Sequence, residues 1–152
     1  VYKIQPMIRR MTPRTFIADS GDTSHVGRSD VEMCYIEHRA STILFGAGDL
    51  ETATKIGKRK GTVIQADGTA TNVTLSNYKH VPKLWTNLFS LTASIASGWK
   101  VCNEGKILVL TKGKQKIKFD RIIKTGDGYL CGVEIPPQGT ADTAMVSQLK
   151  EG

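Results

Sequence analysis

Short β-rich runs separated by turn residues constrain the fold of this 152-residue chain more than any other feature of its sequence. Several short strands at such spacing favour an all-β sandwich or a compact barrel. At this length the chain is expected to form one domain around one hydrophobic core. The expected strands are Val1–Ile4, Thr15–Ala18, Met33–Ile36, Ser41–Phe45, Gly61–Ala66, Asn72–Leu75, Tyr78–Val81, Trp99–Cys102, Lys106–Leu110, Gln115–Phe119, Arg121–Lys124 and Tyr129–Val133.

One hairpin and one helix can be placed within this pattern. Ala66-Asp67-Gly68-Thr69 has Asp-Gly at its centre, so the runs on either side of it are expected to pair. The segment Leu88–Ala96 has apolar residues at helical spacing, with Asn87 as a possible N-cap and Gly98 as a stop. This predicts a single helix with one apolar face packed on the barrel.

The first half of the chain also contains an apolar run that leads into Asp19, which directly precedes Ser20-Gly21. Aspartic proteases present their catalytic carboxylate in this arrangement. They need two carboxylates, because one accepts a proton from the attacking water while the other protonates the substrate carbonyl. The motif occurs once here, so a protease built from it must dimerise. An ordinary strand-to-turn junction is the alternative interpretation of the tripeptide.

A second candidate motif is the segment Ile56-Gly57-Lys58-Arg59-Lys60-Gly61, in which glycines flank three cations. The paired glycines and the β-branched residues that follow predict a hairpin with a mobile tip. In an active aspartic protease such a tip closes over the bound peptide and donates backbone hydrogen bonds to it. A lysine-rich surface hairpin without a role is the alternative.

Further motifs follow in a fixed order: Asp19-Ser20-Gly21-Asp22-Thr23-Ser24-His25, Val81-Pro82-Lys83-Leu84, Asn87-Leu88-Phe89-Ser90-Leu91, Gly98-Trp99-Lys100-Val101 and Gly128-Tyr129-Leu130. Together they resemble the protease region of copia-type retrotransposon polyproteins. That family is typified by Asp-Ser-Gly-Ala-Thr-Ser/Cys-His, Val-Pro-x-Leu-x-x-Asn-Leu-Leu-Ser-Val, Gly-Tyr-x-Val and Gly-Leu-Tyr in the same order. The similarity runs from about Thr15 to Leu130.

The resemblance implies a retropepsin-like closed β-barrel with one short helix, active as a homodimer. Its function would be that of an aspartic endopeptidase that processes its own Gag-Pol polyprotein in the cytoplasm, inside a virus-like particle. The resemblance makes Asp19 catalytic, with Ser20 and Gly21 shaping the turn, and it requires no cofactor and no metal. The implied substrate-binding residues are Asp22, Thr23, Leu88 and the predicted tip over residues 56–61. The protease domain would cover residues 1–135, followed by a flexible or weakly helical tail over 136–152.

The chain departs from the patterns of these proteases at several positions. Asp22 stands where the copia-type pattern has Ala, and a second carboxylate beside the catalytic pair would either raise the pKa of that pair by like-charge repulsion or favour basic substrate side chains. The three cations of the predicted tip would repel those of a symmetry-related tip. Retroviral proteases have an Asp at the position of Thr23 and an Arg at that of Leu91. The absence of both partners leaves no unpaired buried charge.

The net charge supports an alternative function of a different class. Lys and Arg number 21 against 14 Asp and Glu, which gives a formal charge of +7 and suggests an acidic partner such as nucleic acid. Lys112, Lys114, Lys116 and Lys118 alternate, so a strand through them would show a lysine stripe that either protects a sheet edge or tracks RNA. The alternative is therefore a catalytically silent β-domain that binds nucleic acid or assembles with other polyprotein domains.

The cysteines and histidines are scattered and lack metal-ligand spacing, so no zinc site is expected. The cysteines are expected to be buried reduced thiols, and His25 is expected to be a structural hydrogen-bonding residue. No apolar run approaches the roughly 20 residues of a membrane span, and no signal peptide is recognisable at Val1. A start at Val1 fits a segment excised from a longer polypeptide.

Overall fold

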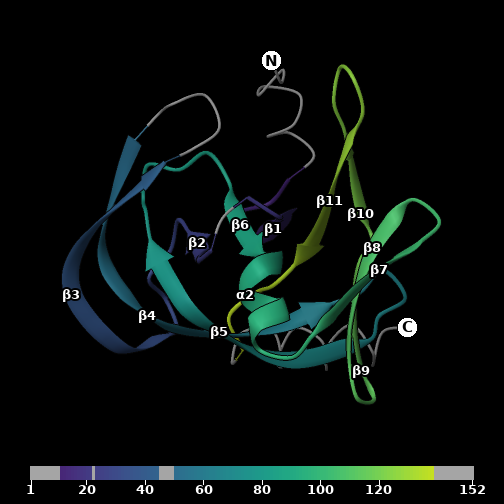
Figure 1. Cartoon of the computed structure of the whole chain (residues 1–152), viewed down its shortest axis with the longest axis horizontal. Coiled ribbons are helices and arrows are strands. Elements are labelled where there is room, and N and C mark those ends of the chain that lie inside the picture. The colour runs from purple at the N-terminus through teal and green to yellow at the C-terminus, as the bar shows by residue number, and fades with distance from the viewer. Residues whose placement is uncertain (1–10, 22, 45–49, 139–152) are drawn as a thin grey trace, which may run out of the picture.

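The computed structural model of the chain describes residues 11–21, 23–44 and 50–138. Within these residues the fold is mostly β with one short helix, which confirms the predicted class (Figure 1). The elements are β1 (Thr15–Asp19), β2 (His25–Gly27), β3 (Met33–Leu44), β4 (Leu50–Ile64), β5 (Ala70–His80), β6 (Asn87–Ser90), α2 (Leu91–Ala96), β7 (Lys100–Glu104), β8 (Ile107–Lys112), β9 (Gln115–Phe119), β10 (Arg121–Lys124) and β11 (Tyr129–Glu134). The expected strand Val1–Ile4 lies outside the described residues.

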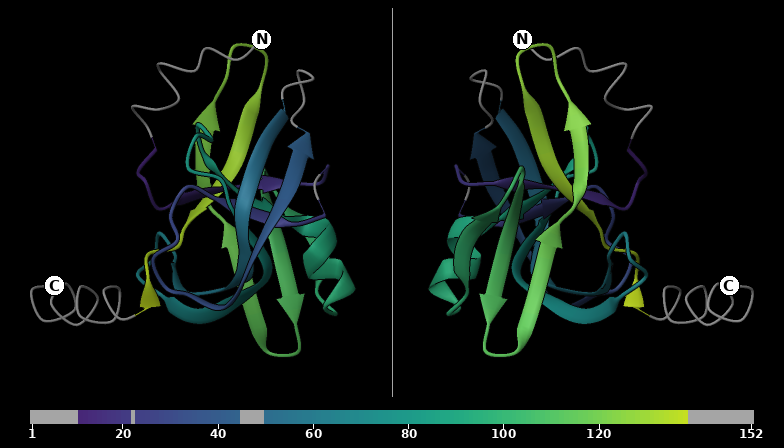
Figure 2. Two further views of the ribbon diagram at one scale, coloured as in Figure 1. Left: turned by 90° about the vertical axis from the view of Figure 1, so that its left-hand side faces the viewer. Right: turned by 90° about the vertical axis from the view of Figure 1, so that its right-hand side faces the viewer.

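Two sheets make up the described fold. The larger is a mixed eight-stranded sheet in the order β10-β11-β1-β6-β2-β5-β4-β3. An additional pairing between β11 and β4, at Glu134 and Ile64, completes a ring of hydrogen bonds through β1, β6, β2, β5, β4 and β11. The smaller sheet has the order β7-β8-β9. Figure 2 shows the β10–β11 and β8–β9 hairpins pointing to opposite ends of the molecule.

The main hydrophobic core joins the ring to the three-stranded sheet. Its aromatic members include Phe16 of β1, Phe89 of β6 and Phe119 of β9. The rings of Phe89 and Phe119 meet edge to face, with 5.1 Å between their centroids. Burial of each such side chain contributes about 1.5–3 kcal/mol, so the core holds β1 and β6 firmly together with the smaller sheet.

The Asp-Gly hairpin is confirmed. Strands β4 and β5 are antiparallel, and Ile64 pairs with Ala70 across the turn. The Gln65 N–H donates to the Thr69 carbonyl at 2.9 Å, and Gly68 adopts a φ of +88°, which costs glycine little.

The helix is shorter than predicted, because its expected first turn is a strand. Residues Asn87–Ser90 pair with β1 as the parallel strand β6, and the helix begins only at Leu91. Ser90 caps it by accepting the Ala93 N–H at 3.0 Å. Pairing with β1 has overridden the local helical spacing, so the proposed Asn87 cap is wrong.

The predicted lysine stripe is also wrong. Lys112 ends β8 and pairs with Gln115 of β9, so the chain reverses between these strands rather than continuing through the four lysines. On β9 itself, Lys116 is exposed while Ile117 and Phe119 are buried, as expected for a strand with one solvated face. Lys116 lies 2.5 Å from Glu104 of β7.

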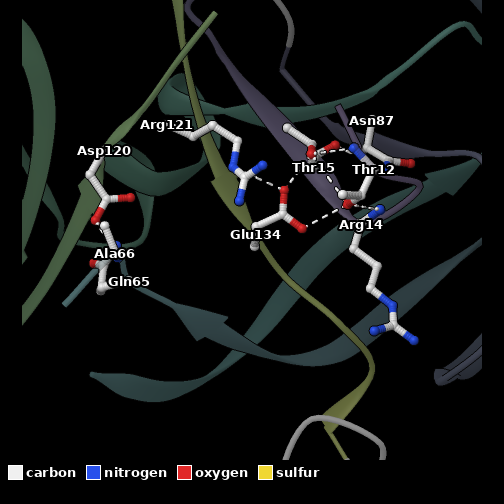
Figure 3. A network of polar contacts seen from close by, with 9 residues as sticks. All are labelled: Thr12, Arg14, Thr15, Gln65, Ala66, Asn87, Asp120, Arg121 and Glu134. Atoms are coloured by element: carbon white, nitrogen blue, oxygen red, sulfur yellow. Dashed lines mark hydrogen bonds and ion pairs between the residues drawn. The ribbon is translucent and has the colours of Figure 1, made fainter. Parts of the chain in front are cut away.

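A polar network anchors the start of β1 (Figure 3). The Glu134 carboxylate accepts hydrogen bonds from the hydroxyls of Thr12 and Thr15, at 2.7 Å in the case of Thr12. The Arg121 guanidinium lies 3.2 Å from the same carboxylate. The network therefore ties the segment that leads into β1 to both β10 and β11. Beyond it, the Thr62 N–H donates to the Pro136 carbonyl at 3.1 Å, so the chain stays packed on β4 after residue 135.

Only part of the expectation for the cysteines holds. The three cysteines form no disulfide, but Cys102 is exposed and Cys34 is half-buried, whereas Cys131 is buried. The described residues contain no group of three or more His, Cys, Asp or Glu side chains that could hold a metal ion. In the same part of the chain, no helix is long and apolar enough to cross a membrane.

Candidate active site

Asp19 is the last residue of β1, and its carboxylate is held by its own turn. The Gly21 N–H donates to Asp19 Oδ1 at 2.8 Å. A hydrogen bond from a backbone N–H to a carboxylate is charge-assisted, so it fixes the side chain more strongly than a neutral bond. Asp19 is half-buried, whereas Ser20 and Gly21 are exposed. The three residues of the sequence motif therefore form one compact turn.

The strand beneath this turn is locked between two neighbours. β1 is antiparallel to β11 and parallel to β6, with Asp19 directly opposite Ser90. The Asn87 amide donates to the carbonyls of Pro13 and Thr15 at 2.9 and 3.0 Å. Its side-chain oxygen accepts the Arg28 N–H at 2.9 Å. Asn87 thus joins β1, β6 and the end of β2, a positioning role that sequence reasoning missed because it took Asn87 for a helix cap.

The helix reaches the turn from the other side. The Thr92 hydroxyl donates to the Ser20 carbonyl at 3.2 Å. The Ser94 hydroxyl donates to the Ser90 carbonyl at 3.0 Å, so the start of α2 is fixed on β6. The candidate catalytic turn therefore rests on the junction between β6 and α2.

The predicted substrate-binding residues are not all gathered at this turn. Thr23 is exposed, and its carbonyl accepts from Asn77 at 3.4 Å. Leu88 pairs with Ile17 of β1 and is half-buried against the hydrophobic clusters below the turn. Asp22 lies outside the described residues, so its proposed effect on substrate preference stays a prediction.

The predicted hairpin tip over residues 57–61 is wrong. These residues lie inside β4, which pairs with β3 on one side and β5 on the other. Lys58 is opposite Cys34, and Gly57 is opposite Tyr78. The sequence between β3 and β4, residues 45–49, lies outside the described residues. Paired glycines around a polar segment indicated a turn, but two flanking strands bury the backbone there instead.

Arg59 faces the core rather than a substrate. Its side chain is 4% exposed, and Nη2 donates to the Ile135 carbonyl at 2.9 Å. The guanidinium lies 4.9 Å from the ring centroid of Phe16 and 5.8 Å from that of Tyr78. Burial lowers the pKa of Arg59 from its ordinary value. Arg59 therefore does not contribute to the expected repulsion between the cations of two symmetry-related tips.

We expect Gly57→Val to reduce stability rather than turnover alone. A Cβ at Gly57 would lie 2.7 Å from the Cys34 carbonyl oxygen and 3.2 Å from that of Tyr35, and both are backbone atoms. Overpacking of this kind costs about 1–3 kcal/mol. Urea denaturation measures the loss, with Gly126→Val as control, because a Cβ at Gly126 meets nothing within 4 Å. Unchanged stability with lost cleavage would favour a substrate-facing role for Gly57.

His25 is the histidine nearest in sequence to the turn, and it is buried. The Ser90 N–H donates to its Nδ1 at 3.0 Å, which places the imidazole proton on Nε2. The rings of His25 and Phe89 pack in a T-shaped arrangement, with 4.7 Å between their centroids. Burial lowers the pKa of His25 to about 4. This confirms the expectation that His25 is a structural hydrogen-bonding residue.

The lowered pKa predicts an acid-sensitive fold. The unfolded chain takes up a proton at His25 more readily than the folded chain does, because the ordinary pKa is about 6.5. The contribution of neutral His25 is therefore complete above about pH 6.5 and is lost as the pH falls towards about 4. We expect the free energy of unfolding to fall by about 2 kcal/mol between pH 7 and pH 5, and His25→Asn to remove this component. An identical pH dependence in both proteins would contradict it.

No protein-family model, no curated protein and no solved structure matches the chain. A pocket of about 170 Å³ lies between β5, α2 and the three-stranded sheet, with His25, Phe89 and Trp99 among its walls. Asp19 is not part of that pocket, so the pocket is not taken as the place of reaction.

Proposed function

We propose that the protein is an aspartic endopeptidase of the retropepsin type, active as a homodimer. The observation that carries the proposal is the position of Asp19. It ends a strand that is buried at Phe16 and Ile17, in parallel register with β6, and its carboxylate is held by the Gly21 N–H. The ring of hydrogen bonds through six strands and the single short helix in the described residues are compatible with a retropepsin-like barrel.

The proposed mechanism uses one Asp19 from each protomer. The two carboxylates share one proton and hold a water between them. The ionised carboxylate takes a proton from this water as it attacks the scissile carbonyl, and the protonated one donates to the carbonyl oxygen. The tetrahedral intermediate then breaks down as the leaving nitrogen takes up the proton that the first carboxylate removed from water, while the second carboxylate recovers its proton from a hydroxyl of the intermediate. No covalent enzyme intermediate is formed in this scheme.

The dimer follows from the chemistry of the pair, because one carboxylate cannot be acid and base at once. Ser20 is exposed beside Asp19, and its hydroxyl is proposed to bond across the two-fold axis and hold the two turns together. Peptide segments of the chain's own Gag-Pol polyprotein are the proposed substrates, cut in the cytoplasm within a virus-like particle. Thr23 and Asp22 would border the bound peptide.

Cleavage of a peptide pool in the presence and absence of a pepstatin-type transition-state analogue tests this proposal. We expect endoproteolytic cleavage that the analogue inhibits, since transition-state analogues bind far more tightly than substrates. Mass spectrometry of the products reports internal cuts. Absence of cleavage at protein concentrations where the chain is dimeric would reject the proposal.

The second candidate function is nucleic-acid binding by the three-stranded sheet. Residues 100–119 carry six lysines and one glutamate, so most of the formal charge of +7 lies on this sheet and its turns. In the described structure, no large aromatic residue of this sheet is exposed. The sheet would therefore bind nucleic acid through phosphate contacts rather than base stacking. Fluorescence anisotropy with a labelled single-stranded RNA tests it. Binding that weakens steeply with salt and is lost in Lys114→Glu would favour this candidate.

A further inference from the structure

The backbone N–H of Ser90 forms the hydrogen bond that links β2 to the support of the candidate catalytic turn. Ser90 lies opposite Asp19 in the parallel pair β1–β6, and it is fully buried. It is also the residue at which the strand becomes a helix, because its hydroxyl caps α2. A shift of Ser90 would therefore move both the strand that supports Asp19 and the helix that contacts the Ser20 carbonyl through Thr92.

His25 supplies the acceptor for this N–H. A buried backbone N–H without a partner costs about 1–3 kcal/mol, so the acceptor must stay in place. His25 Nδ1 lies 3.0 Å from the Ser90 nitrogen, and the imidazole is 4% exposed. Its ring is held by Phe89, the residue that precedes Ser90. Packing thus holds the imidazole in place, and the hydrogen bond from Ser90 to the imidazole holds the junction between β6 and α2.

We propose that His25 is a positioning residue for Asp19, holding the β6–α2 junction through the Ser90 N–H so that the catalytic turn keeps its geometry. The proposal rests on the aspartic protease function proposed above. His25 does not act as an acid or base in it, because its Nδ1 lone pair is occupied by Ser90. Its contribution is to the orientation of a reacting carboxylate. Misplacement by about 1 Å can cost a catalytic site roughly 100-fold in rate.

The positioning role needs a neutral imidazole. Protonation of Nδ1 would turn the acceptor into a donor facing the Ser90 N–H, and the bond would be lost. The pocket that His25 lines is also lined by five uncharged side chains from β5, β6, α2, the residue before β7, and β9: Leu75, Phe89, Ser94, Trp99 and Ile117. Burial alone accounts for the lowered pKa of His25. The site is therefore expected to lose its geometry on the acid side, where the histidine becomes charged.

Two substitutions of His25 separate positioning from packing. In His25→Asn the amide oxygen can occupy the place of Nδ1 and accept from Ser90. In His25→Gln the amide is one carbon further out, nearer the place of Nε2. The two amides have similar polarity, and neither titrates. His38 on β3 is exposed and provides the matched control, as His38→Asn and His38→Gln.

Cleavage kinetics of the four variants form the first arm of the test. We expect His25→Gln to lower kcat roughly 10- to 100-fold, with KM nearly unchanged, and His25→Asn to keep most of the activity. His25→Asn should also keep its activity to lower pH than the wild-type chain. Equal kcat values for His25→Gln and His25→Asn, in dimeric and folded proteins, would overturn the proposal.

Amide signals in nitrogen-edited NMR spectra form the second arm, which does not depend on cleavage. We expect the Ser90 and Gly21 signals to move on acidification of the wild-type chain and in His25→Gln, but to stay near their neutral-pH positions in His25→Asn. A Gly21 signal unaffected by either change would overturn the positioning role. Failure of the wild-type chain to cleave any peptide would instead reject the proposed function, while these signals still decide whether His25 holds the turn.

Discussion

Replacement of Asp19 by Asn is expected to abolish peptide cleavage while leaving the fold intact. An amide matches the carboxylate in shape, and its oxygen can still accept the Gly21 N–H that now donates to Asp19 Oδ1. It cannot take a proton from water. General acid–base catalysis contributes roughly 10²- to 10⁴-fold, so the cleavage rate should fall by at least that factor. Initial rates with a single fluorogenic peptide measure the loss.

Asp127→Asn is the matched control for this experiment. Asp127 is exposed in the turn between β10 and β11, far along the chain from the motif. Asp127→Asn removes the same charge as Asp19→Asn, so a general effect of charge on substrate binding would appear in both variants. Undiminished cleavage by a well-folded Asp19→Asn protein would remove the assignment of Asp19 as the catalytic residue.

The largest effect on stability is expected for Gly27→Ala. A Cβ at Gly27 would lie 1.7 Å from Tyr78 Oη and 2.4 Å from its Cζ. Tyr78 is fully buried, and its hydroxyl donates to the Ser29 carbonyl at 2.7 Å. The ring must move to admit the methyl group, which adds the loss of this hydrogen bond to the cost of overpacking. Together these amount to about 3 kcal/mol or more.

Gly126→Ala is the control for Gly27→Ala, because a Cβ at Gly126 meets no atom within 4 Å. Surface substitutions of that kind usually change stability by less than about 0.5 kcal/mol. Urea denaturation, monitored by tryptophan fluorescence, compares the stability of the two variants. Equal stability of both variants would mean that Tyr78 does not pack against Gly27, and that β2 and β5 are held together in another way.

The β content of the fold could be predicted because its signals are local. Runs of β-branched residues predicted strands, and the Asp67-Gly68 pair predicted a hairpin. The turn of this hairpin depends on the backbone of those two residues. Alternating exposure on β9 follows directly from alternating Lys and apolar residues. The strand-to-turn position of Asp19 was likewise visible, since an apolar run leads into Ser20-Gly21.

The errors arose where distant strands decide the structure. Leu88 to Ser90 has apolar spacing that also suits a helix, but β1 recruits this segment as a parallel strand. The glycines at 57 and 61 indicated a turn, whereas both pair with β5, and β3 and Pro137 lie on the other side of β4. The burial of Arg59 depends on Phe16 and Tyr78, which are distant in sequence. None of these partners can be read from the local pattern.

The central claim is that each active site contains one Asp19 from each of two protomers. It is tested most directly by mixing the wild-type chain with Asp19→Asn at constant total concentration, above the range in which dimers dissociate. Subunits are first exchanged under mild denaturation and refolded together. A heterodimer has only one carboxylate, so it lacks either the acid or the base and is expected to be inactive.

Cleavage activity is then measured against the fraction of wild-type subunits. If two Asp19 residues form one site, activity should follow the square of that fraction, so an equal mixture retains about one quarter of the wild-type activity. A straight proportionality, with about one half retained in an equal mixture, would mean that each chain carries a complete site and would contradict the account.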